Sequence, residues 1–395
     1  DNKEAYELAV HFGKIIFPYI IFISLAAHFA SINNVHERFA AGAFAPAILN
    51  ISFILSLFFL TPFVTTAGHA LSYGVLIGGV LQFLYLYRAV LNFYRPRIRI
   101  PVINEKLKKF FKLFLPGVFG SGVIQLNIVI GTIIASFLPV GAISHIYYAD
   151  RLNQLPLAIF GIALGIVLLP SLSKAIKQSD LDTTNNIQNR SIEFSLLISF
   201  PSAIGLFILA EPIIQILFER GAFVKEDTFY TAKVLSYFAL GLPAYIIIKV
   251  LVSCFFARED TRTPLYISIV SVISNIVLSL LLIGSMREMG IALATAISAW
   301  INALLLYVFL YTRNLIQFDD ILVKNSFKIF VSSAILFAAI YVLNGALFNN
   351  IIENAALVNS GLLLLMIFLA IIIYFALVIV LKVLTINQLR EYLKK

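Results

Sequence analysis

Eleven long apolar stretches occupy almost the whole of this 395-residue chain. A helix needs about 20 apolar residues to cross a bilayer, and every stretch reaches that length. We predict spanning helices at 9–31, 43–64, 68–92, 110–138, 150–173, 192–218, 230–257, 264–284, 289–313, 325–348 and 357–384. The chain is therefore predicted to be an all-α polytopic membrane protein with 11 transmembrane helices.

Composition supports the bilayer as the solvent of this chain. Hydrophobic residues make up 61% of it and charged residues 12%, which is too apolar for a soluble domain of this length. The segment 362–381 is apolar on every face, whereas the strands of a membrane barrel alternate. The single cysteine, Cys254, lies inside a span, and the five histidines show no metal-ligand spacing. We expect no disulfide, no metal and no cofactor.

Basic residues gather on one side of the predicted membrane. With residue 1 outside, most of the 29 lysines and arginines fall at inner ends of spans, as the positive-inside rule requires. Segment 93–109 is then a cytoplasmic basic linker and 385–395 a cytoplasmic tail. The net charge of +9 thus reflects topology and contact with membrane lipids, and no nucleic-acid partner is expected. The longest connection, 173–191, is predicted to be a linker or a short surface helix.

An internal repeat organises the spans. A shift of about 225 residues overlays 17–88 on 242–313 without a gap, so that Pro18 meets Pro243 and Asn50 meets Asn275. Three further spans precede the second copy, which makes six spans one repeat. The same shift places the start of the first repeat about 117 residues before Asp1. We therefore expect three helices upstream, for 14 in all.

The repeat divides the chain into lobes. Residues 1–92 are predicted to be the last three helices of an incomplete N-terminal lobe, and 110–313 a complete C-terminal six-helix lobe. Residues 325–384 are two additional C-terminal helices. Two six-helix lobes in the same orientation, with a cavity between them, suit transport by alternating access.

Charged residues inside spans are expensive and usually face a cavity, which makes them candidates for function. Asp150 and Arg151 are predicted to begin a span just before a bend at Pro156. The Arg151 guanidinium suits bidentate phosphate binding, and the alternative is a structural ion pair with Asp150. Lys249 lies too deep for comfortable snorkelling and is expected to line the cavity, whereas Lys14 either lines the cavity or snorkels to the interface.

Uncharged polar residues also occur within the apolar helices. They are Gln125, Asn127, Asn275 and Ser279. Hydrogen bonding between helices explains most residues of this kind. Gln125 is kept as a fifth cavity candidate beside the four charged residues.

Several segments resemble the MurJ family, also called MviN, of bacterial lipid II flippases. The most specific is YYADRLNQLPLAIFGIALGIVLLPSLS (147–173). Others, in family order, are FPYIIFISL (17–25), FAPAILNIS (44–52), GGVLQ (78–82), LPGVFGSGVIQLN (115–127) and KVLVSCFFAREDTRTP (249–264). The resemblance covers nearly the entire chain and places it in the multidrug/oligosaccharidyl-lipid/polysaccharide exporter superfamily.

The resemblance implies a 14-helix flippase of the bacterial inner membrane, expected to act as a monomer. It implies a cationic cavity for the pyrophosphate of lipid II and a groove beside the last two helices for the polyprenyl tail. Arg151 matches a cavity arginine of the family, Asp150 is its neighbour, and Lys249 adds positive charge. Some relatives bind sodium through acidic residues, but Asn127, Asn275 and Ser279 stand near the matching places without a carboxylate, so coupling to a monovalent cation is unsupported.

Two alternatives remain beside lipid II transport. A drug/cation antiporter or polysaccharide-lipid flippase belongs to the same superfamily, but an antiporter should carry a carboxylate deep in a span. A polytopic glycosyltransferase should carry catalytic carboxylates in large outer loops, which this chain lacks. Ser144, His145 and Asp150 lie close in sequence but have no nucleophile-elbow context, so no enzymatic activity is predicted.

Overall fold

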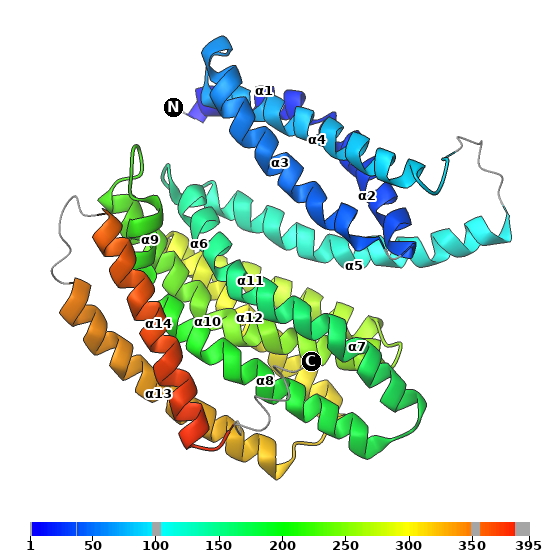
Figure 1. The fold of residues 1–395 in the computed structure, drawn as a ribbon, viewed down its shortest axis with the longest axis vertical. Coiled ribbons are helices and arrows are strands. Elements are labelled where there is room, and N and C mark those ends of the chain that lie inside the picture. Colours follow the sequence, from blue (N-terminus) through cyan, green and yellow to red (C-terminus); the bar gives the residue numbers. More distant parts are fainter. Residues whose placement is uncertain (1, 37, 97–103, 349–355, 384–395) are drawn as a thin grey trace. The chain divides into compact units, whose positions relative to one another are not determined.

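The computed structural model describes residues 2–36, 38–96, 104–348 and 356–383, and within them it contains helices and turns but no strand (Figure 1). This agrees with the bilayer as solvent, since a helix satisfies its backbone hydrogen bonds internally. The chain divides into two compact units, Asp1–Leu107 and Lys108–Lys395. The predicted lobe boundaries stay a prediction, and part of the predicted linker 93–109 lies outside the described residues.

Unit 1 is a small helical bundle. Its elements are α1 (Asn2–Ile16), α2 (Tyr19–Val35), α3 (Phe39–Leu60), the short helix η1 (Thr61–Phe63) and α4 (Ala67–Leu91). Helix α4 packs against both α2 and α3. Glycines on α4 allow this close approach, because a Cβ at Gly79 would lie 2.4 Å from the Tyr19 ring of α2 and one at Gly74 would lie 2.3 Å from the Ser56 hydroxyl of α3.

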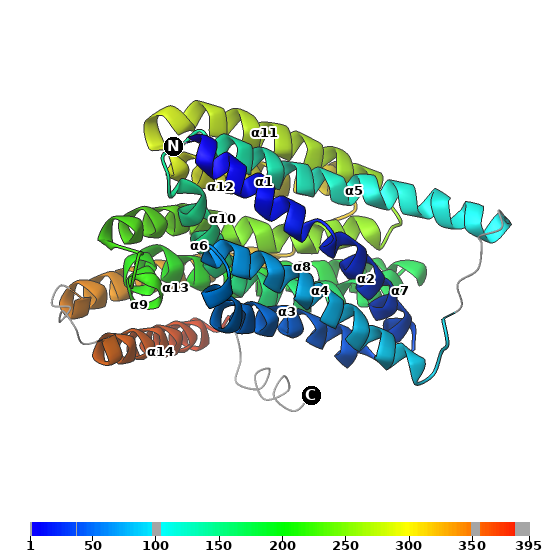
Figure 2. The same ribbon diagram turned by 90° about the horizontal axis from the view of Figure 1, so that it is seen from above.

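Unit 2 is a larger bundle whose long helices run alongside one another (Figure 2). Its elements are α5 (Glu105–Ala135), which begins at the unit boundary, α6 (Ala142–Pro156), the π-helical turn η2 (Leu157–Gly161), α7 (Ile162–Lys177), α8 (Leu181–Ile208), α9 (Ala210–Phe218), α10 (Lys225–Phe256), α11 (Arg262–Met286), α12 (Glu288–Thr312), α13 (Asp320–Phe348) and α14 (Ala356–Val380). Helix α10 is central, because it packs against α6, α7, α8, α9 and α12.

The helical, multi-pass architecture is confirmed. By length and apolar composition, eight described helices can cross a membrane, and the bent pair of α1 and α2 makes a ninth. Every predicted span overlaps a helix, but the full count of eleven spans stays a prediction. The first span, predicted as one helix over 9–31, bends by 43° between α1 and α2, next to Pro18. Proline has no backbone N–H to continue the hydrogen-bond ladder.

Two predicted boundaries were wrong. The helix predicted to begin at 150 begins at Ala142, so Asp150 and Arg151 lie well inside α6. The helix predicted to begin at 192 begins at Leu181, so the connection 173–191, predicted to be a linker or a short surface helix, is mostly helix, and only residues 178–180 separate α7 from α8. The carboxylate of Asp180 starts α8 by accepting a hydrogen bond of 2.9 Å from the backbone N–H of Thr183.

The polar first turns of α8 have partners in the connection between α12 and α13. Arg190 donates from Nη2 to the Asp319 carboxylate, with an N–O distance of 2.6 Å. Asn189 donates from Nδ2 to the backbone carbonyl of Gln317 at 2.8 Å. These hydrogen bonds explain why a polar segment continues the helix instead of forming a loop.

The helix bounds agree with the internal repeat. Shifted by about 225 residues, α3 falls on α11, α4 on α12, and α1 with α2 on α10. The packing agrees as well, since α12 packs against α10 and α11 as α4 packs against α2 and α3. Pro243, the counterpart of Pro18, lies inside the continuous helix α10.

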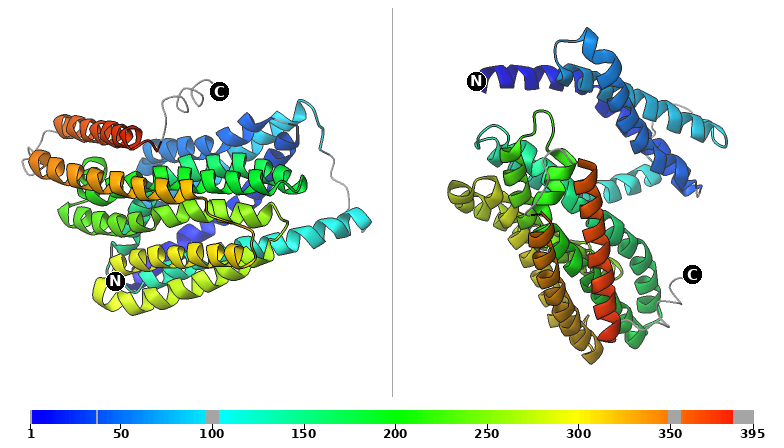
Figure 3. Two further views of the ribbon diagram at one scale, coloured as in Figure 1. Left: turned by 90° about the horizontal axis from the view of Figure 1, so that it is seen from below. Right: turned by 60° about the vertical axis from the view of Figure 1, so that its left-hand side comes forward.

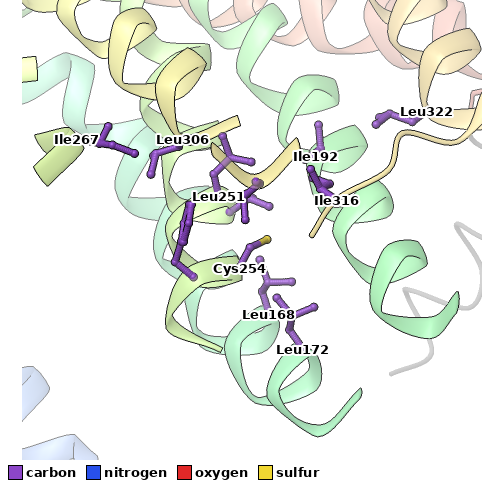
Figure 4. Packing of buried hydrophobic residues seen from close by; sticks show 12 residues of the cluster. Leu168, Leu172, Ile192, Leu251, Cys254, Ile267, Leu306, Ile316 and Leu322 are labelled. Carbon is purple, nitrogen blue, oxygen red and sulfur yellow. The ribbon is translucent and has the colours of Figure 1, made fainter. Parts of the chain in front are cut away.

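Two large clusters of buried side chains form much of the core of unit 2. Buried side chains of α7, α8, α10 and α12 surround the single thiol of Cys254 (Figure 4). The second cluster joins α8 and α9 to the last two helices, and Tyr374 of α14 donates from its hydroxyl to the backbone carbonyl of Leu197 at 2.7 Å. Helices α13 and α14 lie side by side (Figure 3). The C-terminal helix pair is therefore part of the packed unit.

Candidate functional site

Arg151 is an exposed cation on a helix that overlaps the predicted span 150–173. It lies on α6, and its guanidinium carbon is 4.6 Å from the centre of the Tyr147 ring. Nη2 donates to the Tyr147 hydroxyl at 3.0 Å. Residues four apart share one face of a helix, so the α6 backbone sets this contact. The tyrosine holds the planar guanidinium in place and uses only one of its five N–H donors.

Asp150 is half-buried and has a partner of its own. Its carboxylate accepts a hydrogen bond from the Gln154 side chain, one helical turn further on. In the part of the chain that the structure describes, Asp150 and Arg151 form no ion pair with each other. Tyr147 and Gln154 were not predicted as site residues, although the four-residue spacing to their partners can be read from the sequence.

Helix α10 brings a second cation to this region. The Tyr245 hydroxyl is buried, has no hydrogen-bond partner among the described residues, and lies within the electrostatic reach of Asp150. Lys249 is four residues further along the same helix and is exposed. Its ammonium has no hydrogen bond, ion pair or ring contact in the described residues. Because α6 packs against α10, unit 2 places Arg151, Asp150 and Lys249 on neighbouring helices.

The backbone changes form directly after these side chains. Helix α6 ends at Pro156, and the π-helical turn η2 leads into α7. The Asn153 side chain is buried one turn earlier, and its Oδ1 has no hydrogen-bond partner among the described residues. Wide turns of this kind often occur at functional sites in helices. Asn153 is a further polar group that sequence reasoning missed.

Two predicted site residues are not joined to this group. Gln125 on α5 is exposed, and no described contact links it to Arg151. Lys14 is exposed on α1, in unit 1. The assignment of either to a cavity stays a prediction.

Asn275 has the helix-to-helix hydrogen bond expected of a polar residue in an apolar helix, and Ser279 bonds to Asn275 within α11. Asn275 on α11 donates from Nδ2 to the Thr295 hydroxyl of α12 at 3.2 Å. The Ser279 hydroxyl donates to Asn275 Oδ1 at 3.1 Å. Asn275 thus links α11 to α12, and Ser279 satisfies the remaining amide oxygen of Asn275.

Comparison with known proteins covers almost the whole chain. The family described as "Lipid II flippase MurJ" matches residues 1–369. A "Probable lipid II flippase MurJ" of Rhizobium tropici is 37% identical over 402 residues, which cover 100% of this chain and 75% of the relative. A protein of the same description from Rhizobium meliloti (strain 1021) is 39% identical over 346 residues, which cover 87% of this chain and 64% of that protein.

A solved structure agrees with the sequence relatives. It is described as "Lipid II flippase MurJ, inward closed conformation" and matches with a TM-score of 0.77 at 28% identity. The match covers 93% of this chain and 72% of the solved one. Sequence and fold thus point to the same relatives.

Proposed function

Because the chain belongs to the lipid II flippase MurJ family, we propose that it moves lipid II from the inner to the outer leaflet of the bacterial inner membrane by alternating access, with Arg151 binding the pyrophosphate. The observation that carries this proposal is the exposed Arg151 guanidinium, held on the Tyr147 ring in the middle of α6. A cation in a membrane helix is costly and is retained where it meets a charged ligand.

The geometry of Arg151 suits a pyrophosphate. A guanidinium can donate two parallel hydrogen bonds to two oxygens of one phosphate. Tyr147 accepts one hydrogen bond from Nη2 and leaves the other donors available. Since the side chain is already held in one orientation, binding costs less conformational entropy than it would for a free arginine.

Lys249 and Asp150 adjust the charge around this group. The exposed Lys249 ammonium is a second cation for the head group, without the directional fork of arginine. Asp150, held by Gln154, offsets part of the positive charge on α6 when no ligand is bound. A moderate net attraction allows the head group to bind on one side of the membrane and leave on the other.

The proposal needs no covalent step, bound cofactor or second copy of the chain. An inside-negative potential assists outward movement of a polyanion by about 2.3 kcal/mol per charge per 100 mV. The membrane potential can therefore provide the driving force.

The test is reconstitution of the chain in vesicles with fluorescent lipid II, with translocation followed by quenching from outside. Arg151→Lys should keep the charge, lose the planar fork and lose most of the transport, and Arg151→Ala should lose all of it. Arg220→Lys is the matched control, because Arg220 is an exposed arginine whose described hydrogen bond goes to the backbone carbonyl of Leu217. It should transport normally.

The double variant Asp150→Ala, Arg151→Ala separates binding from structure. If Arg151 only balanced the charge of Asp150, removing both charges would restore transport. If Arg151 binds the pyrophosphate, the double variant stays inactive at normal membrane abundance. Restored transport would refute the binding role.

A further inference from the structure

A buried histidine joins three helices at the predicted outer end of unit 2. His145, in the first turn of α6, is 5% exposed. Its Nε2 is 3.0 Å from Oδ1 of Asp227, in the first turn of α10. Its Nδ1 is 3.0 Å from Oε1 of Glu288, the first residue of α12. One imidazole thus contacts two carboxylates that lie 82 and 143 residues away in the sequence.

These two distances specify the protonation state of the ring. An ionised carboxylate only accepts hydrogen bonds, and neutral imidazole has a single N–H. Neutral His145 would therefore turn an unprotonated nitrogen toward a carboxylate oxygen at 3.0 Å and lose one hydrogen bond. The imidazolium donates to both. Two carboxylates at this distance also favour the charged ring.

The charges around His145 also favour a protonated ring. Glu288 is 0% exposed, and a buried carboxylate without positive partners is strongly destabilising. Its second oxygen is 3.4 Å from Nε of Arg287 and has no hydrogen-bond partner among the described residues. The Arg287 guanidinium lies over the Tyr230 ring, 4.6 Å from its centre, and His145 stacks on the same ring. With a protonated His145, the two positive charges of His145 and Arg287 balance the two negative charges of Asp227 and Glu288. With a neutral His145, the two negative charges face the single positive charge of Arg287.

The charged groups on each neighbouring helix are few. Asp227 comes from α10, whose first turns also carry the exposed Lys225, Glu226 and Lys233, and Glu288 with Arg287 comes from the start of α12. The α8 charges that lie in its first half, Asp182, Arg190 and Glu193, are near its predicted inner end. On α6 itself, Asp150 and Arg151 follow His145 by about one and a half turns.

We propose that His145, as an imidazolium, is a positioning residue for Arg151. Its two hydrogen bonds hold the first turn of α6 against the starts of α10 and α12. Binding of the head group therefore depends on the proton of His145. This inference rests on the proposed function of Arg151. Loss of the proton removes one of the two hydrogen bonds of His145 and leaves less positive charge beside the Glu288 carboxylate. The α6 turn that carries Tyr147 and Arg151 then has a weaker attachment to α10, the helix that carries Lys249.

The first experiment determines the protonation state of the His145 ring directly and does not depend on transport. The full chain labelled with ¹⁵N-histidine is studied by NMR in nanodiscs, and the His145 signals are identified by their loss in His145→Gln. At pH 7 both ring nitrogens of His145 should carry protons. A neutral His145 ring at pH 7 would overturn the proposal whether or not the protein moves lipid II.

The second experiment tests whether head-group binding depends on the protonation of His145. Affinity for a soluble pyrophosphate head-group analogue is measured from pH 6 to pH 9 by isothermal titration calorimetry. In the unmodified chain the affinity should fall once His145 deprotonates, by up to about tenfold per pH unit. Glu288→Gln should flatten this fall, because a glutamine amide can hydrogen-bond to a neutral imidazole. His28→Gln is the matched control and should keep the original profile.

The outcomes separate the two proposals. If Arg151→Ala leaves the affinity unchanged, the proposed role of Arg151 has failed, and the NMR result still decides the state of His145. If Arg151 binds the analogue but Glu288→Gln and the unmodified chain share one pH profile, the positioning role of His145 is refuted.

Discussion

The hydroxyl of Tyr147 accepts a hydrogen bond from Nη2 of Arg151 at 3.0 Å, while the ring of the same tyrosine lies 4.6 Å from the guanidinium carbon. One side chain thus holds the guanidinium in two ways, through its ring and through its hydroxyl. The two contributions can be removed separately by substitution.

Tyr147→Phe should keep the ring contact and lose the hydrogen bond, whereas Tyr147→Ala should lose both. We expect a small loss of head-group affinity in the first variant. In the second we expect a loss of about 1–2 kcal/mol, a factor of about 5–30. Titration calorimetry with the pyrophosphate analogue measures both. Equal affinities for Tyr147→Ala and the unmodified chain would show that Arg151 needs no support from the ring.

Gly290 on α12 should tolerate no side chain. A Cβ there would lie 2.8 Å from the backbone carbonyl oxygen of Leu282, which cannot rotate away. Gly290→Ala is expected to destabilise the protein by about 1–3 kcal/mol through overpacking. Gly284→Ala on α11 is the matched control, since a Cβ there meets nothing within 4 Å. Thermal unfolding in detergent should show a lower Tm for the first variant alone.

Asp260 stabilises the turn between α10 and α11. Its carboxylate accepts from the backbone N–H and the hydroxyl of Thr263, and Arg313 Nη1 donates to it at 3.1 Å. Asp260→Asn should lose the ion pair, a surface interaction of about 1 kcal/mol or less. Asp260→Ala should also lose the helix cap, at a further cost of about 1 kcal/mol. Equal Tm values for the two variants would exclude a capping role.

The same carboxylate predicts a response to acid. Burial raises the pKa of Asp260, but the hydrogen bonds from Thr263 and the charge of Arg313 outweigh it and hold the pKa below its ordinary value. A depressed carboxyl pKa adds stability that is complete above the unfolded value of about 3.9 and is lost as the pH falls through the folded value. Acid should therefore lower the Tm of the unmodified chain more than that of Asp260→Asn below about pH 4.

Cys254 offers a readout of unfolding that needs no introduced label. It is the only cysteine and is 0% exposed. We expect a water-soluble maleimide to leave it unmodified at pH 7 in the folded protein and to react as unit 2 unfolds. Ser285→Cys, at an exposed position, should react at once and serves as the control. Rapid labelling of the native chain would contradict the packing around Cys254.

Hydropathy predicted the helical fold because apolar length is a local property. It placed the start of α6 at residue 150, whereas the helix begins at Ala142. It placed the start of α8 at residue 192, although the capping residue Asp180 could have been recognised from the sequence. Helices that begin with polar residues extend beyond the apolar stretch, and hydropathy cannot detect that extension.

The candidate site was only partly predictable. Arg151, Asp150 and Lys249 stand out as charges in apolar helices, and their four-residue neighbours could have been added. Tyr245, four residues before Lys249, could have been added in the same way, but its electrostatic interaction with Asp150 depends on how α6 and α10 pack. The contacts of His145 depend on residues far away in the sequence, so no local pattern could show that this ring joins three helices.

Pro18 and Pro243 occupy equivalent places in the two copies of the repeat, yet one accompanies a bend of 43° and the other lies inside a continuous helix. Two helices joined by a bend can change their angle at the bend, whereas a continuous helix has no such joint. Although their sequences correspond, we therefore expect the first copy to bend more easily at this place than the second.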